Sequence, residues 1–385
     1  MNSARGLYEK SSEIFLENVR WLLSSDIRIK NGHNKGALYG WKNLNPPSFP
    51  FIYSEITGYA VTCFSWIASE FGNKKALGAA EEATGWILRN LNSNLLFARP
   101  PAEKDQLNNL SRLFYSFDNS MILIGIVSLY KLTKKKSLLA LAEIIAHALI
   151  EHFFDGEKLV PRLDNSFNPI KPIGEDGVVK WSTTSGAYHC KLSLGLLELT
   201  RITGNKKYAH ISDSLCSYAI EQQKSDGQFI TNPGSDVAYL HPHLYACEGL
   251  IYSGIKESND IHYNAGLCGI KWAMKHISSG KGGTFRDTGK QSVEQSDCTA
   301  QLLRLLITCQ SKLENSINNA RLEDIIEKLH LRLLDFYIEF GEGKGAMKYH
   351  LAKDTACSWC TMFSLQALNL WKTKNSPPLW IDYFV

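Results

Sequence analysis

The sequence has no long hydrophobic run. No stretch approaches the roughly 18–20 uninterrupted apolar residues that a membrane-spanning helix needs. The N-terminal MNSARGLYEKSSEIFLENVRWLL carries charged and polar residues where a signal peptide would need an unbroken apolar stretch. Its nine cysteines are odd in number and scattered, which favours free thiols over a disulfide framework. We therefore expect a cytoplasmic protein without a signal peptide or a membrane span.

A strong charge imbalance is also missing. The formal net charge is only +4, and the longest basic run is Lys134-Lys135-Lys136. This composition excludes the basic stripe typical of nucleic-acid-binding proteins, so no nucleic-acid partner is expected. The chain also lacks a phosphate-binding glycine loop and a serine-centred nucleophile elbow. We expect neither a cofactor nor a metal, and the sequence makes no prediction of oligomeric state.

An internal repeat is the most informative feature that the chain does contain. The segment EFGNKKA at 70–76 recurs as ITGNKKY at 202–208, and LTKKK at 132–136 is a weaker copy. Glycine at a helix C-terminus adopts the left-handed conformation, and the following Asn or Lys begins the return helix. Each copy is therefore predicted to be the tight turn of a helical hairpin.

The segments before and after these turns differ in polarity. Apolar helices precede the turns and recur roughly every 55–70 residues: ITGYAVTCFSWIASEF, FDNSMILIGIVSLYKL, SGAYHCKLSLGLLELTRI, HPHLYACEGLIYSGI, SDCTAQLLRLLITC and CSWCTMFSLQALNLW. Amphipathic helices follow them, and short segments such as NSNLLFARP, GEKLVPRLD, SDGQFITN, GGTFRD and GKGAMKYH lead to the next apolar helix. Helices that are apolar on every side should be buried inside a ring of amphipathic ones.

This pattern predicts an all-α fold, an (α/α)6 toroid of six helical hairpins with short strand-like connecting loops. An open solenoid is the alternative, and closure is preferred because the apolar helices need cover on all sides. The predicted divisions are an N-terminal helix and arm packed on the toroid at 1–50, the toroid itself at 51–375 and a C-terminal tail at 376–385.

The repeats, together with the phrases SEITGY, SFDNSM, HPHLYACEG, QSDCTAQ and SWCTMFSLQAL, resemble a known group of proteins. The resemblance is to the six-hairpin (α/α)6 toroid superfamily, which includes glycoside hydrolases, polysaccharide lyases and sugar 2-epimerases. It covers the chain from about Pro47 to Trp371. It implies a carbohydrate-active enzyme, glycoside hydrolase-like or lyase-like, acting on an oligosaccharide or surface-glycan intermediate.

Polar residues gather at the predicted N-termini of the apolar helices, which should all open into one cup. The candidate catalytic residues are Glu55, Asp118, His243, Glu248, Asp297 and His350. The candidate substrate-binding residues are Tyr53, Tyr59, Trp181, Tyr188, His189, His241, Gln295, Asp354 and Trp359. Acids and imidazoles can transfer protons, aromatic faces stack on sugar rings, and amides bond sugar hydroxyls. Converging helix N-termini add positive potential, which favours an acidic sugar.

Several alternatives remain open. Helix caps are expected at Asp118, at Ser296 or Asp297, and at Ser358, so these residues could cap helices rather than act on a substrate. The HPHLYACEG phrase is similar to the sugar 2-epimerase pattern, which implies an epimerase or isomerase that uses His243 and His350. A non-catalytic sugar-binding toroid and a prenyl-binding toroid with an apolar cup are further possibilities.

Overall fold

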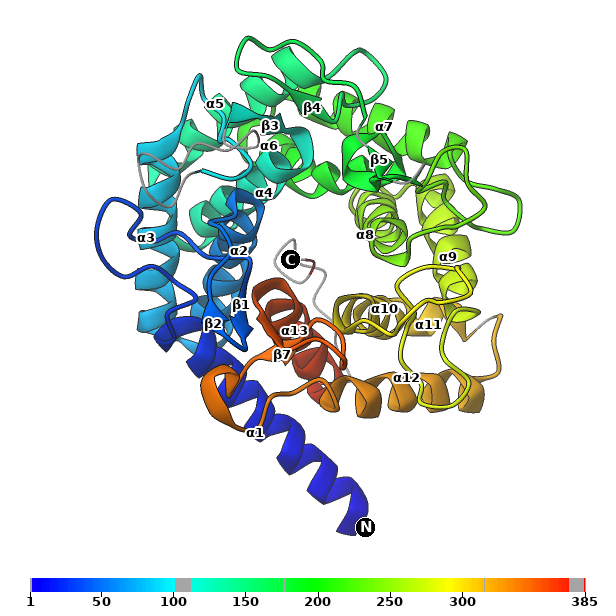
Figure 1. The fold of residues 1–385 in the computed structure, drawn as a ribbon. Coiled ribbons are helices and arrows are strands. Elements are labelled where there is room, and N and C mark those ends of the chain that lie inside the picture. Colours follow the sequence, from blue (N-terminus) through cyan, green and yellow to red (C-terminus); the bar gives the residue numbers. More distant parts are fainter. Residues whose placement is uncertain are drawn as a thin grey trace.

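The described part of the chain forms a closed ring of helices in the computed structural model (Figure 1). It comprises residues 2–100, 112–172, 174–175, 178–314, 316–373 and 384. Inner helices are α2 (Ser54–Phe71), α4 (Ser116–Thr133), α6 (Ser193–Thr203) with the 3-10 helix η3 (Ala187–Leu192) before it, α8 (Leu240–Lys256), α10 (Ser296–Thr308) and α13 (Ser358–Thr373). Outer helices are α3 (Lys74–Asn90), α5 (Lys136–Phe153), α7 (Lys206–Glu221), α9 (Asp260–Met274) and α12 (Asn319–Leu334), and the short α11 (Gln310–Leu313) follows α10. The predicted (α/α)6 toroid is confirmed, and the open solenoid is excluded.

The repeated turn motif folds for the reason that its residues suggest. Gly72 and Gly204 end α2 and α6 in the left-handed conformation, with φ of 61° and 75°. Lys134 ends α4 in the same conformation, with φ of 58°, although it carries a side chain. The side chains of Asn73 and Asn205 then cap α3 and α7 by accepting backbone N–H groups of their first turns. The hairpin turns are thus specified locally.

Burial separates the two layers. In α2 every residue from Ser54 to Ala68 is buried, whereas α3 buries only one face. The inner helices therefore form the core of the ring, and the outer helices shield them from water. No helix among the described residues is long and apolar enough to cross a membrane.

The sixth hairpin combines the two ends of the chain. Helix α1 (Asn2–Ser24) packs against α13, the last inner helix, and also touches α3. It occupies the outer position beside α13 in Figure 1. In the part of the chain that the structure describes, five outer helices follow an inner helix in sequence, and the partner of the last inner helix comes first in the chain.

Short strands join the repeats at one end of the ring. They are β1 (Trp41–Leu44), β2 (Pro47–Ser48), β3 (Phe114–Tyr115), β4 (Arg162–Leu163), β5 (Gly174–Glu175), β6 (Val178–Val179), β7 (Met347–Lys348) and β8 (Thr355–Cys357), with 3-10 turns η2 (Trp181–Thr183) and η4 (Gly341–Gly343). One sheet has the order β2-β1-β8-β7, and in it Trp41 pairs antiparallel with Cys357. This sheet joins the N-terminal arm to the last repeat and so closes the ring.

Candidate functional site

A cavity of about 320 Å³ opens among the N-termini of the inner helices. This volume lies in the range of small-molecule sites, about 300–1,000 Å³. The lining residues are Trp41, Tyr53, Glu55, Ile56, Arg99, Lys180, Trp181, Tyr239, His241, Tyr245, Arg286, Gln295, Asp297, Tyr349, Lys353, Thr355, Cys357 and Trp359. The cavity therefore lies at the end of the ring where the sequence placed the cup.

The predicted site residues divide into two groups. Those that line the cavity are Tyr53, Glu55, Trp181, His241, Gln295, Asp297 and Trp359. Those that lie outside its lining are Tyr59, Asp118, Tyr188, His189, His243, Glu248, His350 and Asp354. The first group comes from helix N-termini and the loops that precede them, and in the second group every residue except His350 and Asp354 is buried.

Glu55 is a buried acid in the first turn of α2. Burial raises the pKa of Glu55, because the charged form loses hydration. Hydrogen bonds from Tyr53 and Tyr59 and the nearby imidazole of His241 act in the opposite direction. The net shift favours the protonated acid, so this carboxyl is suited to donate a proton.

Asp118 is in the first turn of α4 and does not cap the helix. Burial and then the negative charge of Glu55 hold the pKa of Asp118 well above its usual range. Its Oδ2 is buried and has no hydrogen-bond partner among the described residues. Asp118 is thus a buried acid that responds to the charge of Glu55 but does not line the cavity.

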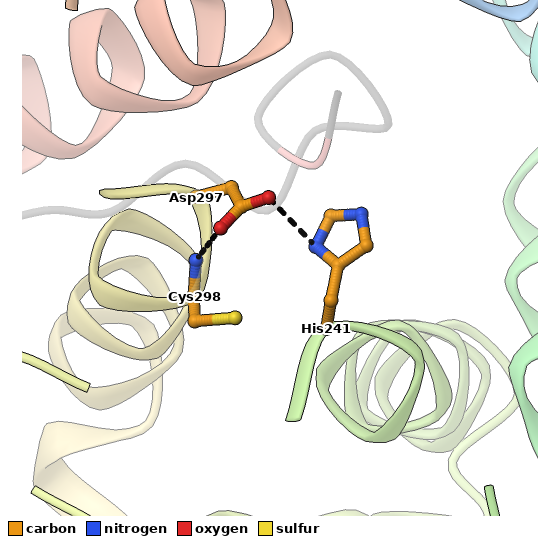
Figure 2. Close-up of side chains that lie close together, drawn as sticks. All are labelled: His241, Asp297 and Cys298. Carbon is orange, nitrogen blue, oxygen red and sulfur yellow. Dashed lines mark hydrogen bonds and ion pairs between the residues drawn. The ribbon is translucent and has the colours of Figure 1, made fainter. Parts of the chain in front are cut away.

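Asp297 and His241 form a second polar group, contributed by α10 and α8 (Figure 2). The His241 Nδ1 lies 3.7 Å from the Asp297 Oδ2 and 2.7 Å from the Gln301 Oε1. Asp297 accepts the indole N–H of Trp359 at 3.0 Å and the backbone N–H of Cys298 at 2.7 Å. When Nδ1 donates to Gln301, Nε2 carries the lone pair, so His241 can act as a base through that atom.

Aromatic rings form the walls between these polar groups. The Trp41 ring stands edge-on to the Trp359 ring, with centroids 6.1 Å apart. Across the cavity lining, Trp181 packs edge-on to His241 at 6.0 Å and tilted to Tyr245 at 6.5 Å. Such flat apolar faces beside polar side chains suit a sugar ring, which has C–H faces and hydroxyl edges.

Four cationic side chains complete the lining, and the sequence analysis did not identify them: Arg99, Lys180, Arg286 and Lys353. The Arg99 guanidinium lies 4.0 Å from the centroid of the Phe51 ring. Burial and the neighbouring Arg99 lower the pKa of Lys180. All four lie outside the inner helices, so helix patterns gave no signal. The one available clue was an arginine in two equivalent connecting segments, FARP and TFRD.

His243 and Glu248 occupy structural positions on α8. The His243 ring is fully buried and uses both nitrogens, because Nδ1 accepts the Phe229 N–H at 3.2 Å and Nε2 bonds the Gly269 carbonyl at 2.9 Å. Glu248 accepts Lys191 Nζ and Arg304 Nη2, each at 2.8 Å. The bonds of both side chains are satisfied within the ring, and neither reaches the cavity lining.

The remaining predicted residues support the site or lie apart from it. Tyr59 shares a hydrogen bond with the cavity-lining Tyr245, with oxygens 2.5 Å apart. Tyr188 donates to the Thr184 carbonyl. Burial lowers the pKa of His189 to about 3, and this ring bonds the Ser116 hydroxyl at 3.0 Å.

The predicted pair from the last repeat lies beyond the cavity. His350 is half-buried and packs beside Tyr349, which does line the cavity. The Asp354 side chain is 66% exposed and pairs with Lys348. Neither residue lines the cavity with the other candidates.

The architecture defines the class of protein: the chain is a six-hairpin (α/α)6 toroid. A cellobiose 2-epimerase from Spirochaeta thermophila DSM 6192 superposes with a TM-score of 0.76 at 14% identity, covering 96% of this chain and 97% of that one. An unsaturated glucuronyl hydrolase from Bacillus sp. GL1 gives a TM-score of 0.68 at 14% identity, over 94% and 96% of the two chains. A sugar epimerase from a ruminal bacterium gives 0.75 at 13% identity, over 95% and 99%.

Sequence comparison identifies a shorter region of similarity. The model of glycosyl hydrolase family 47 matches residues 119–235, from the first turn of α4 to the loop before α8. Comparison with curated protein sequences gives no match. The toroid fold is thus shared along the whole chain, and the family similarity is confined to its middle repeats.

Proposed function

We propose that the protein is a carbohydrate-active enzyme, hydrolase-like, that acts on an acidic sugar or oligosaccharide held in the 320 Å³ cavity. The observation that carries this proposal is the placement of Glu55 and the Asp297–His241 group in one aromatic-walled cavity. The likeness to epimerases and hydrolases of the same fold supports it.

Glu55 is the proposed general acid. Burial raises its pKa, which favours the protonated form, and a glycosidic leaving group needs a proton when its bond to the sugar breaks. Asp297 is the proposed base, because both of its oxygens act as acceptors and it lies on a different inner helix from Glu55. In the proposed hydrolysis, the oxygen of a water molecule bonds to the sugar carbon while Asp297 takes a proton from that water. The glycosidic bond breaks, and Glu55 protonates the departing oxygen.

We propose an acidic substrate because of the cationic side chains in the cavity lining. Arg99, Lys180, Arg286 and Lys353 all line the cavity, whereas Glu55 and Asp297 are the carboxylates there. Four cations thus face two carboxylates, and positive charge predominates around the cavity although Arg286 also pairs with Asp287. A sugar carboxylate or phosphate would be attracted to it, most strongly at low salt.

A mass-spectrometric assay tests the reaction. Metal-free protein is incubated with neutral and uronate-bearing oligosaccharides in water enriched in ¹⁸O and, separately, in deuterium oxide. Hydrolysis inserts one ¹⁸O atom into the product, whereas elimination by a lyase inserts none and creates a carbon–carbon double bond. We expect ¹⁸O insertion for acidic substrates and a loss of about 10²–10⁴ in rate for Glu55→Gln and Asp297→Asn. The matched control Glu221→Gln changes an exposed glutamate of α7 and should retain full activity.

Sugar epimerisation is the second candidate function. The observation that favours it is the position of the His241 ring in the cavity lining. Its bond to Gln301 leaves Nε2 as an acceptor that can remove the proton beside a sugar carbonyl. This assignment replaces the pair His243 and His350, neither of which lines the cavity. Deuterium incorporation at carbon 2 without ¹⁸O insertion would identify this reaction. Binding without any product would instead identify a sugar-binding toroid, and no binding of any sugar would reject the proposal.

We further propose that the protein works in a reducing compartment such as the cytoplasm. All nine cysteines are free thiols, and eight of them are buried. The prenyl-binding alternative is disfavoured, because an apolar ligand would require the charged lining groups to lose their hydration.

A further inference from the structure

Three potential metal ligands meet at the edge of the cavity. A His241 ring nitrogen, an Asp297 carboxylate oxygen and the Cys298 thiol all lie within 4.8 Å of one another. Figure 2 shows His241 rising from α8, with the Asp297 carboxylate and the Cys298 sulfur projecting toward it from the start of α10. Asp297 and Cys298 are both buried, and His241 is half-buried.

We propose that His241, Asp297 and Cys298 form a binding site for a zinc ion. Imidazole nitrogen, carboxylate oxygen and thiolate sulfur are the donors that zinc prefers, at roughly 2.0–2.3 Å from the ion. Donors at these distances on a tetrahedral ion are roughly 3.3–3.8 Å apart. The separation between the His241 Nδ1 and the Asp297 Oδ2 is already 3.7 Å. The sulfur needs to approach by about 1.5 Å at most to complete a three-ligand site.

The surroundings hold these ligands in place. Trp359 donates its indole N–H to the Asp297 Oδ2, and Ser296 anchors the start of α10 by donating to the Lys348 carbonyl at 2.6 Å. Such outer contacts orient metal ligands before the ion binds. His241 and Asp297 line the cavity, so the fourth position of the ion would open toward it and could accept water or a substrate oxygen.

Proton balance gives the site a measurable signature. The ion takes the place of the His241 Nδ1 proton, which moves to Nε2 so that the ring stays neutral. Cys298 loses its thiol proton to solvent, and the thiolate and the Asp297 carboxylate together neutralise the two positive charges. Burial and the Asp297 charge raise the pKa of the metal-free Cys298 thiol. One proton should therefore be released for each ion bound at neutral pH.

Cobalt(II) titration of the full-length, metal-free protein tests the proposal without any substrate. We expect one ion per chain, a near-ultraviolet thiolate-to-cobalt charge-transfer band, and displacement of cobalt by zinc with release of one proton. Cys298→Ser should abolish the band and weaken zinc binding at least tenfold, roughly the smallest effect expected for losing a ligand. The matched control Cys309→Ser changes a buried cysteine at the other end of α10 and should keep both.

Two results would overturn the site: no stoichiometric ion in the wild type, or an unchanged band in Cys298→Ser. If that variant unfolds, His241→Ala provides a second test, because its half-buried side chain can be removed with less disturbance. Retention of wild-type zinc affinity in His241→Ala would also contradict the proposal. The experiment measures binding alone, whereas the oligosaccharide assay uses metal-free protein, so either proposal can fail without the other.

Discussion

His241 and His243 show how two positions in the first turn of one helix give the same residue type different roles. His241 lines the cavity and bonds the Gln301 side chain, whereas His243 bonds two backbone groups inside the ring. A histidine whose nitrogens both serve the backbone cannot exchange protons with a substrate without breaking those bonds. The chemical role therefore belongs to His241 in our proposals.

Alanine substitutions separate the two roles. His243→Ala should lower the free energy of unfolding by about 2–4 kcal/mol, because it leaves the Phe229 N–H and the Gly269 carbonyl buried without partners. His241→Ala should change stability by about 1 kcal/mol or less and lower sugar turnover about 10²–10⁴-fold. Urea unfolding and the oligosaccharide assay measure the two quantities. A stable His243→Ala protein or a fully active His241→Ala protein would contradict this division.

Buried histidines also predict the pH dependence of stability. Burial lowers the pKa of His243 to about 4, below its usual value of 6.5. The unfolded chain therefore binds a proton at this residue between about pH 6.5 and 4, while the folded chain does not, so acid favours unfolding there. Relative to His243→Gln, the wild type should lose up to about 1.4 kcal/mol of stability per pH unit in this window. Urea unfolding at several pH values measures the difference, and a gap that is constant with pH would refute it.

Individual site residues were predictable where their chemistry conflicted with their surroundings. Glu55 stands out because an acid in an apolar helix needs a function or a partner. The same argument also selected Glu248, whose partners Lys191 and Arg304 lie on other helices and could not be foreseen from spacing. The possible metal ligands His241, Asp297 and Cys298 could likewise not be foreseen as a group, since they meet only after folding.

At the scale of elements, close approach of α2 and α4 depends on two glycines. A Cβ atom at Gly125 would lie 2.6 Å from the Gly58 carbonyl oxygen, and one at Gly58 would lie 2.7 Å from the Ile122 backbone nitrogen. Both obstacles are backbone atoms, which cannot turn aside as a flexible side chain can. The two helices therefore meet at a distance that no larger residue permits.

Gly125→Ala should accordingly destabilise the protein by about 1–3 kcal/mol through overpacking. The matched control is Gly78→Ala in α3, where nothing lies within 4 Å of the added Cβ. That change should be neutral or stabilise by up to about 1 kcal/mol, since alanine favours the helix. Thermal unfolding of the two variants compares them directly. Equal melting temperatures would show that the helices separate without penalty.

Elements with local signals were predicted well. The glycine-asparagine turns and the apolar helices are encoded within a few consecutive residues, and they fold as expected. The sequence did not reveal that α1 is the outer partner of α13, because the two helices lie at opposite ends of the chain. The hydrophobic periodicity of a helix shows that one of its faces is buried, but it does not show which distant helix covers that face.

At the scale of the whole molecule, a buried ion network ties facing inner helices together. Glu248 on α8 bonds Lys191 on η3 and Arg304 on α10, and Arg304 also donates to Gln366 on α13. The charged side chains are 0% exposed. Removing one partner from such a cluster leaves the others charged in a medium of low polarity.

Glu248→Ala should therefore lower the free energy of unfolding by about 3–5 kcal/mol. The control Glu81→Ala removes a surface pair with Lys135 and should change it by about 0.5 kcal/mol or less. The midpoints of urea unfolding report both effects. A Glu248→Ala protein as stable as the control would show that the network is dispensable to the ring.

The strand pairing of Trp41 with Cys357 has a consequence for biosynthesis. In a nascent chain, β1 is synthesised long before its partner β8. Trp41 also lacks its aromatic neighbour in the cavity wall until Trp359 is synthesised. Each earlier repeat can pack against its neighbour, but the ring stays open where the last repeat is missing. The apolar residues on both sides of this opening remain exposed. Nascent chains halted before residue 355 should therefore recruit chaperones and fail to retain a glycan.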